Sequence, residues 1–417
     1  MNTNSLESSS NKKSKQPEDN NPYVPLDEEL ERNQTVAKEA TTPLVYAYFI
    51  VLGMNSNLFF YLILVTVHYF KHYFPRYPVS FLNLAAAKAA IFITLFVLKL
   101  TSYASYNSQI ISGCVGYIAC FITIVKISES SDESGQTYAT VLALEFLGAL
   151  FSFVYQAGAI RVASFYDKSV YSYYYASAVA AAVISAMLGI ILVYGRYSLS
   201  TFIWTITGLA TVIASACIIF QIAMSRTTFY IENVVNGKHQ PVFSFQNLKE
   251  IYDNIRPHFW WMVLTNVLIG ITYSSIFFEI GPSRINYGIW VNAANIGANL
   301  GEFMGRSIGD ISQLDWIVTK LQWYPFLYNV VIIGVFLIDD QSIFDKFWII
   351  FWVMMFLLLF RAGFCITHYI VSAVGHRKEP NTALLVNYGR ELGIALGSIV
   401  SLLVVYTKGT GDLMNSH

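Results

Sequence analysis

Charged residues are scarce in this chain. Only 12% of its 417 residues are Asp, Glu, Lys or Arg, against about 25% in an ordinary soluble domain. Lys and Arg together number 26, as do Asp and Glu, so the formal net charge is zero. Without an excess of cations to neutralise phosphates, nucleic acid is not an expected partner. Because 55% of the residues are hydrophobic, the composition excludes a disordered chain and favours a membrane protein.

The chain also lacks the motifs of metal, disulfide and nucleotide chemistry. Its four cysteines lie in apolar runs without Cys-x-x-Cys or Cys/His spacing, so neither a disulfide framework nor a zinc site is expected. The sequence has no His-Glu-x-x-His and no Gly-x-x-x-x-Gly-Lys-[Ser/Thr] loop, which excludes the common zinc hydrolases and argues against an ATP-driven pump. We therefore expect a chain that is not an enzyme, with no catalytic residue, no metal ligand and no cofactor.

Long apolar runs dominate what remains. Residues 1–43 are polar and contain no signal-peptide core, which predicts a cytoplasmic tail. Behind this tail, eleven apolar stretches of about 20 residues are long enough to cross a bilayer. They run approximately Leu44–Phe70, Val79–Leu100, Gln109–Ile127, Thr137–Ala163, Val170–Tyr194, Thr201–Met224, His258–Ile280, Ile285–Ile308, Trp316–Ile338, Phe344–Ser372 and Thr382–Tyr406.

The predicted spans fall into two blocks. Six lie in residues 44–224 and five in residues 258–406, separated by the polar segment 225–257. In that segment apolar residues from Phe245 to Ile255 recur at helical spacing, which predicts an amphipathic helix on the membrane surface of a cytoplasmic loop. A 6+5 arrangement predicts an all-α membrane protein of two bundles, resembling the major facilitator fold, with a site between the bundles.

The loop charges predict an orientation. The side richer in Lys and Arg is expected to be cytoplasmic, which puts the N-terminus inside and the short tail 407–417 outside. The plasma membrane is the expected location because the sequence shows no retention or sorting motif. The sequence makes no prediction of oligomeric state.

Polar residues in the eighth span form a stripe. Asn292, Asn295, Asn299, Glu302 and Arg306 are spaced by three or four residues, so they share one face of a helix. Glu302 and Arg306 are close enough to pair. Since polar groups in hydrocarbon are costly, this face is expected to line a cavity rather than meet lipid. Glycines at 297, 301, 305 and 309 form a neighbouring face suited to close helix packing.

Other spans carry fewer polar groups. Asn57 and Phe60 in the first span and Gln156 in the fourth offer hydrogen-bonding and stacking groups for a solute. We interpret Glu145, Arg361, Arg390 and Glu391 as cavity or gate charges, with simple interhelical pairing as the alternative. Lys88 is long enough to snorkel toward the membrane surface and is given no role.

The pattern resembles the equilibrative nucleoside transporters. In the eighth span, Asn299-Leu-Gly-Glu302-Phe-Met-Gly305-Arg306 resembles the family's Asn-x-x-Asp-x-x-Gly-Arg, with Glu in place of Asp. In the first span, Phe60 and Tyr61 stand where the family has tryptophan and asparagine, and Gln156 resembles its fourth-span glutamine. Gly393-Ile-Ala-Leu-Gly397 resembles the Gly-Leu-Ala-Leu-Gly of the last span.

The resemblance implies facilitated diffusion of nucleosides or nucleobases by alternating access of two bundles. It also implies that Glu302 and Arg306 bind and orient the ribose, with Asn57, Phe60, Gln156 and Asn299 completing the substrate site. Two alternatives stay open within transport: a carrier of another polar solute, or one coupled to protons through Glu145, Glu302 or Glu391. A receptor or an intramembrane enzyme is the further alternative, and it lacks a supporting motif.

Overall fold

The computed structural model describes residues 42–77, 79–130, 134–236, 244–271, 276, 282–314, 316–321, 323–338, 341–376 and 380–415. Within this part of the chain the regular elements are helices, and no strand is present. The predicted cytoplasmic tail lies outside the described residues apart from its last two.

The first block contains nine α-helices. They are α2 (Pro43–Ser56), α3 (Leu58–Val65), α4 (Val67–Tyr73), α5 (Val79–Ala89), α6 (Ile91–Thr101), α7 (Tyr106–Ser130), α8 (Gly135–Ala163), α9 (Ser169–Tyr194) and α10 (Leu199–Met224). Polar caps define several helix starts, because the first N–H groups of a helix need acceptors outside it. Ser134 Oγ accepts from the Thr137 amide at 3.3 Å, and Ser198 Oγ accepts from the Thr201 amide at 3.1 Å.

The second block follows a short π-helix, Tyr230–Val235. It comprises α11 (Phe245–Ile271), α13 (Tyr287–Ile308), a 3₁₀ turn (Ser312–Leu314), α14 (Trp316–Lys320), α15 (Tyr324–Ile338), α16 (Gln341–His376) and α17 (Pro380–Asn415). The segment predicted as an amphipathic helix is helical, but it continues through Pro257 into the seventh span as one helix, α11. Likewise, α17 continues through most of the segment predicted to be an outer tail.

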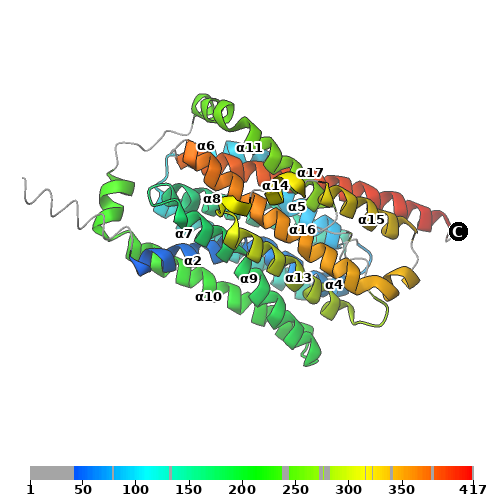
Figure 1. The fold of residues 1–417 in the computed structure, drawn as a ribbon. Helices are drawn as coiled ribbons and strands as arrows, with labels where there is room; N and C mark the ends of the chain where they lie inside the picture. Colours follow the sequence, from blue (N-terminus) through cyan, green and yellow to red (C-terminus); the bar gives the residue numbers. More distant parts are fainter. Residues whose placement is uncertain are drawn as a thin grey trace, which may run out of the picture.

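The long helices lie side by side with their axes roughly along one direction (Figure 1). Within the described residues, six helical segments are long and apolar enough to cross a membrane, and the bent pair α2–α3 adds a seventh. Helices α11, α13 and α15 pack among these segments. Helix α11 packs mainly against α17, and α13 packs mainly against α16. Contacts of α13 with α9 and of α17 with α5 and α8 join the two blocks.

The first span is broken where the sequence predicted one continuous helix. Asn57 separates α2 from α3, which are bent by 45° relative to each other, and Thr66 separates α3 from α4. Asn57 itself has φ −112° and ψ 9°, outside the helical range. The break matters because a backbone carbonyl that leaves the helical pattern inside a membrane must find another donor.

Candidate functional site

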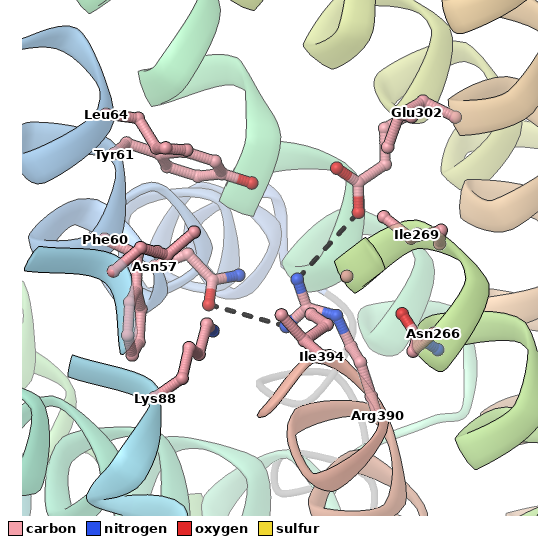
Figure 2. Close-up of a pocket in the computed structure, with 13 residues that line it drawn as sticks. Asn57, Phe60, Tyr61, Leu64, Lys88, Asn266, Ile269, Glu302, Arg390 and Ile394 are labelled. Atoms are coloured by element: carbon pink, nitrogen blue, oxygen red, sulfur yellow. Dashed lines mark hydrogen bonds and ion pairs between the residues drawn. The ribbon is translucent and has the colours of Figure 1, made fainter. Parts of the chain in front are cut away.

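A hollow lined by residues of both blocks lies between them, and small-molecule sites are common at interfaces of this kind. The first block contributes Asn57, Phe60, Tyr61, Leu64, Leu84 and Lys88, and the second contributes Asn266, Ile269, Gly270, Glu302, Leu359, Arg390 and Ile394. Figure 2 shows Asn57, Phe60 and Lys88 on one side of this central cavity, facing Glu302, Asn266 and Arg390 on the other. The cavity therefore lies where two moving bundles would meet.

The break in the first span positions Asn57 at the cavity. At the break, the carbonyl oxygen of Ser56 accepts a hydrogen bond from Gln156 Nε2 at 2.8 Å. The same nitrogen lies 3.4 Å from Asn57 Oδ1, and Gln156 Oε1 accepts from Asn387 Nδ2 at 3.2 Å. Gln156 is thus buried behind the cavity wall, where its amide satisfies the freed carbonyl and fixes the Asn57 side chain.

Helix α13 places the carboxylate of Glu302 at the cavity and the guanidinium of Arg306 in the protein interior. Glu302 lines the cavity, and Arg306, which is fully buried, donates from Nη2 to Glu302 Oε1. Arg306 Nη1 also donates to the carbonyl oxygen of Tyr175 on α9 at 2.8 Å. The pair predicted from the spacing is therefore formed, and the arginine ties α13 to the first block through a charge-assisted hydrogen bond.

A second ion-pair group crosses the cavity. Lys88 Nζ on α5 donates to Glu391 Oε2 on α17 at 2.6 Å, and Arg390 Nη1 donates to Glu391 Oε1 at 2.5 Å. Arg390 also reaches Asn57 Oδ1 at 3.5 Å and Glu302 Oε1 at 3.9 Å. Lys88 Nζ lies 3.6 Å from the centroid of the Phe60 ring, in the range of a cation–π contact.

Two polar residues of the site were missed by the sequence analysis: Asn266, which it did not mention, and Lys88. The misreading of Lys88 is the more informative. We interpreted it as a snorkelling residue, but it is 5% exposed and bridges the two blocks. With it, three cations and two carboxylates form what we call the central charge cluster: Lys88, Arg306, Arg390, Glu302 and Glu391. One positive charge in this cluster is not balanced by a carboxylate of the cluster, which favours a solute rich in hydrogen-bond acceptors.

Some predicted site residues lie elsewhere. Asn299 is buried and donates to the Asn295 carbonyl oxygen at 2.7 Å, and it does not line the cavity. Arg361 on α16 is buried near α14, where Nη2 lies 3.5 Å from the Val318 carbonyl oxygen. Glu145 on α8 is fully buried, and neither of its carboxyl oxygens has a hydrogen-bond partner among the described residues.

The two faces of α13 make different contacts. A Cβ added at Gly301 or Gly305 would lie 2.3 or 2.0 Å from a backbone oxygen of α16, so the glycine face packs directly on that helix. On the polar face, Asn292 lies against Gly189 of α9, and Glu302 is the member of the stripe that reaches the cavity. The part of the stripe nearer the start of α13 therefore lies in a helix–helix contact, where small and polar residues are common.

Residues Gly305 to Gly309 also fit the letters Gly-x-Ser-x-Gly. In hydrolases with this motif, the serine lies on a sharp turn between a strand and a helix. Here the segment is at the end of α13, and Ser307 Oγ donates to the Phe303 carbonyl oxygen at 2.8 Å. The geometry of a nucleophile elbow is not met.

The blocks also meet near the end of α8. Arg161, which is 3% exposed, donates from Nε to Asn381 Oδ1 on α17 at 3.0 Å, and its Nη1 lies 3.4 Å from Gln109 Oε1 on α7. We call these three residues the Arg161 closure. It lies at the end of the bundle that the charge pattern predicts to be cytoplasmic, and it holds the two blocks together there.

Solved structures similar to this chain are transporters. A bacterial homologue of the iron transporter ferroportin in an outward-facing state has a TM-score of 0.57 and 11% identity, covering 88% of this chain and 92% of its own. The major facilitator superfamily transporter FucP in an outward conformation has a TM-score of 0.51 and 14% identity, covering 88% and 99%. A bacterial homologue of the lysosomal transporter Spinster has a TM-score of 0.50 and 10% identity, covering 85% and 80%.

No family model and no curated protein sequence matches the chain. The similarity to solved structures therefore establishes the fold alone. It confirms the predicted fold class: this is an all-α membrane protein with the two-bundle arrangement of the major facilitator superfamily.

Proposed function

We propose that this chain is a membrane carrier of nucleosides or nucleobases that works by alternating access of its two helical bundles. The observation that carries the proposal is the central cavity, because it is shared by both blocks and lined by aromatic and hydrogen-bonding groups. A nucleoside has a flat base that packs on aromatic rings and a ribose with several hydroxyl groups. Phe60 and Tyr61 offer aromatic rings to the base. Glu302, Asn266 and Asn57 offer hydrogen bonds to the ribose hydroxyls.

The resemblance to the equilibrative nucleoside transporters supports this choice of solute. The residues that carry it, Glu302 and Arg306, form an ion pair beside the cavity. A carboxylate held by an arginine is a fixed acceptor for ribose hydroxyls, and such preorganisation reduces the entropy lost on binding. The Arg161 closure agrees with a state that is closed on the predicted cytoplasmic side, with the chain in the plasma membrane and its N-terminus in the cytoplasm.

Substitution of Glu302 tests the site. Glu302→Gln keeps the shape of the side chain but removes the charge that accepts ribose hydroxyls, and hydrogen bonds to charged groups contribute about 1.5–3 kcal/mol. We expect the affinity of the purified protein for radiolabelled adenosine, inosine or uridine to fall by about tenfold to a hundredfold. Arg306→Leu should reduce binding similarly, because it leaves Glu302 without its partner.

The matched control is Lys320→Gln, which removes one charge from an exposed position on α14. It should bind nucleosides as the unmodified chain does. Unchanged binding by both Glu302→Gln and Arg306→Leu would show that the solute binds elsewhere. If the unmodified protein binds no nucleoside or nucleobase, the scaffold serves another polar solute.

A further inference from the structure

Three carboxylates are buried among the described residues, and they differ in their partners. Glu302 is paired with Arg306, and Glu391 with both Lys88 and Arg390. Adding a proton to either would leave a buried cation without its counter-charge, which is strongly unfavourable. Glu145 is 0% exposed and both of its oxygens lack a hydrogen-bond partner in the described part of the chain.

No nearby charge explains Glu145 as an anion. Many ionisable groups of α8 and of the helices that pack on it have partners other than Glu145. These pairs are Lys88 and Arg390 with Glu391, Lys99 over the Phe245 ring, Glu129 with Ser200 and Trp204, Tyr117 with Asn55, Tyr138 with Asn83, Tyr155 with Leu52, and Arg161 with Asn381. Lys126 on α7 is exposed. An isolated carboxylate in an apolar interior is so costly that the group holds a proton instead. Glu145 is therefore neutral in this state.

Polar residues lie along α8 between Glu145 and the predicted outer side. Tyr138 lies two turns before Glu145 on the same face of α8 and donates to Asn83 Oδ1 on α5 at 2.6 Å. The Nδ2 group of Asn83, a fully buried residue, has no partner among the described residues. Tyr77 stacks on Tyr138 with ring centroids 4.6 Å apart. These polar groups lie along α8 between its first turn and Glu145.

Glu145 also lies near the contact that shapes the cavity. One turn further along α8, Gly148 packs against the Phe59 ring. Phe59 meets Phe60 edge-on at 6.2 Å between centroids, and Phe60 lines the cavity beneath Lys88. The central charge cluster has one cation in excess, and Lys88 belongs to α5, which packs on α8. An ionised Glu145 would therefore have a cation on a neighbouring helix to balance it once the bundles move.

We propose that Glu145 is a proton-binding site and that the chain is a proton symporter. In the present state Glu145 holds a proton taken from the outer side, and after the solute binds and the bundles move the acid returns that proton to the inner side. One proton and one solute move together, and the carboxylate left behind takes up a new proton from the outer side when the carrier returns. This inference rests on the proposed carrier function, which it deepens by naming the coupling ion.

The test uses the full chain reconstituted in liposomes with radiolabelled nucleoside outside. Because Glu145 already holds its proton at neutral pH, the initial uptake rate should fall as the external pH is raised above neutral, by at most about tenfold per pH unit, the limit for one bound proton. An imposed inward proton gradient should drive accumulation above the equilibrium level. Glu145→Gln, which keeps a neutral side chain of the same shape, should abolish both effects, and Glu145→Asp should retain them.

His68→Gln is the matched control, because His68 on α4 is a half-buried titratable group that packs on Phe202, away from Glu145. This variant should keep the pH dependence of the unmodified chain. Uptake that is indifferent to external pH, or a Glu145→Gln variant with the pH profile of the unmodified chain, would overturn the inference and leave the nucleoside proposal standing.

A measurement without solute separates the two proposals. Infrared spectroscopy of the protein in liposomes at neutral pH should show a protonated-carboxyl band that Glu145→Gln lacks. Absence of that band overturns the proton site. A band together with no transport of any nucleoside would overturn the proposed solute and support Glu145 as the proton-binding group.

Discussion

At the scale of single residues, Lys88 shows how burial gives a charged side chain a role. Its ammonium group bridges the blocks through Glu391 and also covers the Phe60 ring. Sequence reasoning placed the lysine at the membrane surface because its partner is 303 positions away along the chain. A hydrophobic pattern identifies a lysine within a span, but the direction in which the side chain points depends on tertiary contacts.

Substitutions of Lys88 and Glu391 should be strongly coupled. Lys88→Met alone leaves part of the Glu391 charge uncompensated, and breaking a buried pair costs about 3–5 kcal/mol. Glu391→Gln alone leaves two cations without their carboxylate. The double variant should lose less stability than the sum of the two single losses, which thermal unfolding in detergent would measure. Additive losses would mean that the pair contributes no interaction in the folded protein.

At the scale of helices, the sequence predicted where spans lie better than where they break. Each predicted apolar stretch overlaps described helices, although the end of the stretch His258–Ile280 lies largely outside the described residues. The glycine face of α13 packs on α16 as its spacing indicated. The break at Asn57 was not predicted, because residues 52–61 contain no proline and the glycine at 53 lies within α2. The break depends on Gln156 satisfying the Ser56 carbonyl, a contact between helices that span composition does not reveal.

The site was only partly predicted, because it too depends on contacts between helices. Spacing identified Glu302 and Arg306 as a pair because both residues belong to one helix. It could not show that Asn57 and Glu302 line a shared cavity while Gln156 and Asn299 are buried behind it.

The close packing of α13 on α16 predicts that a larger side chain at the contact lowers the unfolding temperature. Gly305→Ala places a methyl group 2.0 Å from the Phe360 carbonyl oxygen, and overpacking of this kind costs about 1–3 kcal/mol. Gly208→Ala on α10 is the matched control, since nothing lies within 4 Å of its Cβ position. The unfolding temperature should fall for Gly305→Ala and stay unchanged or rise slightly for Gly208→Ala. Equal effects would contradict the packing described for α13.

At the scale of the whole molecule, alternating access requires that contacts between the blocks break in turn. The Arg161 closure holds α8 to α17 at the predicted cytoplasmic end. Arg161→Gln removes a charged hydrogen bond, and we expect it to increase the population open at that end by about tenfold. A cysteine introduced at Ser164 should then react faster with an impermeant thiol reagent from that side. The four native cysteines are buried, so background labelling is low. An unchanged labelling rate would mean that the closure does not hold the two blocks together.

The central claim is that the cavity between the blocks carries nucleosides across a membrane. Uptake of radiolabelled adenosine, inosine and uridine by cells that lack their own nucleoside uptake tests it most directly, against cells with an empty vector. The account predicts saturable uptake of at least one of them, competed by the others and lost in Glu302→Gln. No uptake of any nucleoside by protein shown to be at the cell surface, at acidic or neutral external pH, would contradict it.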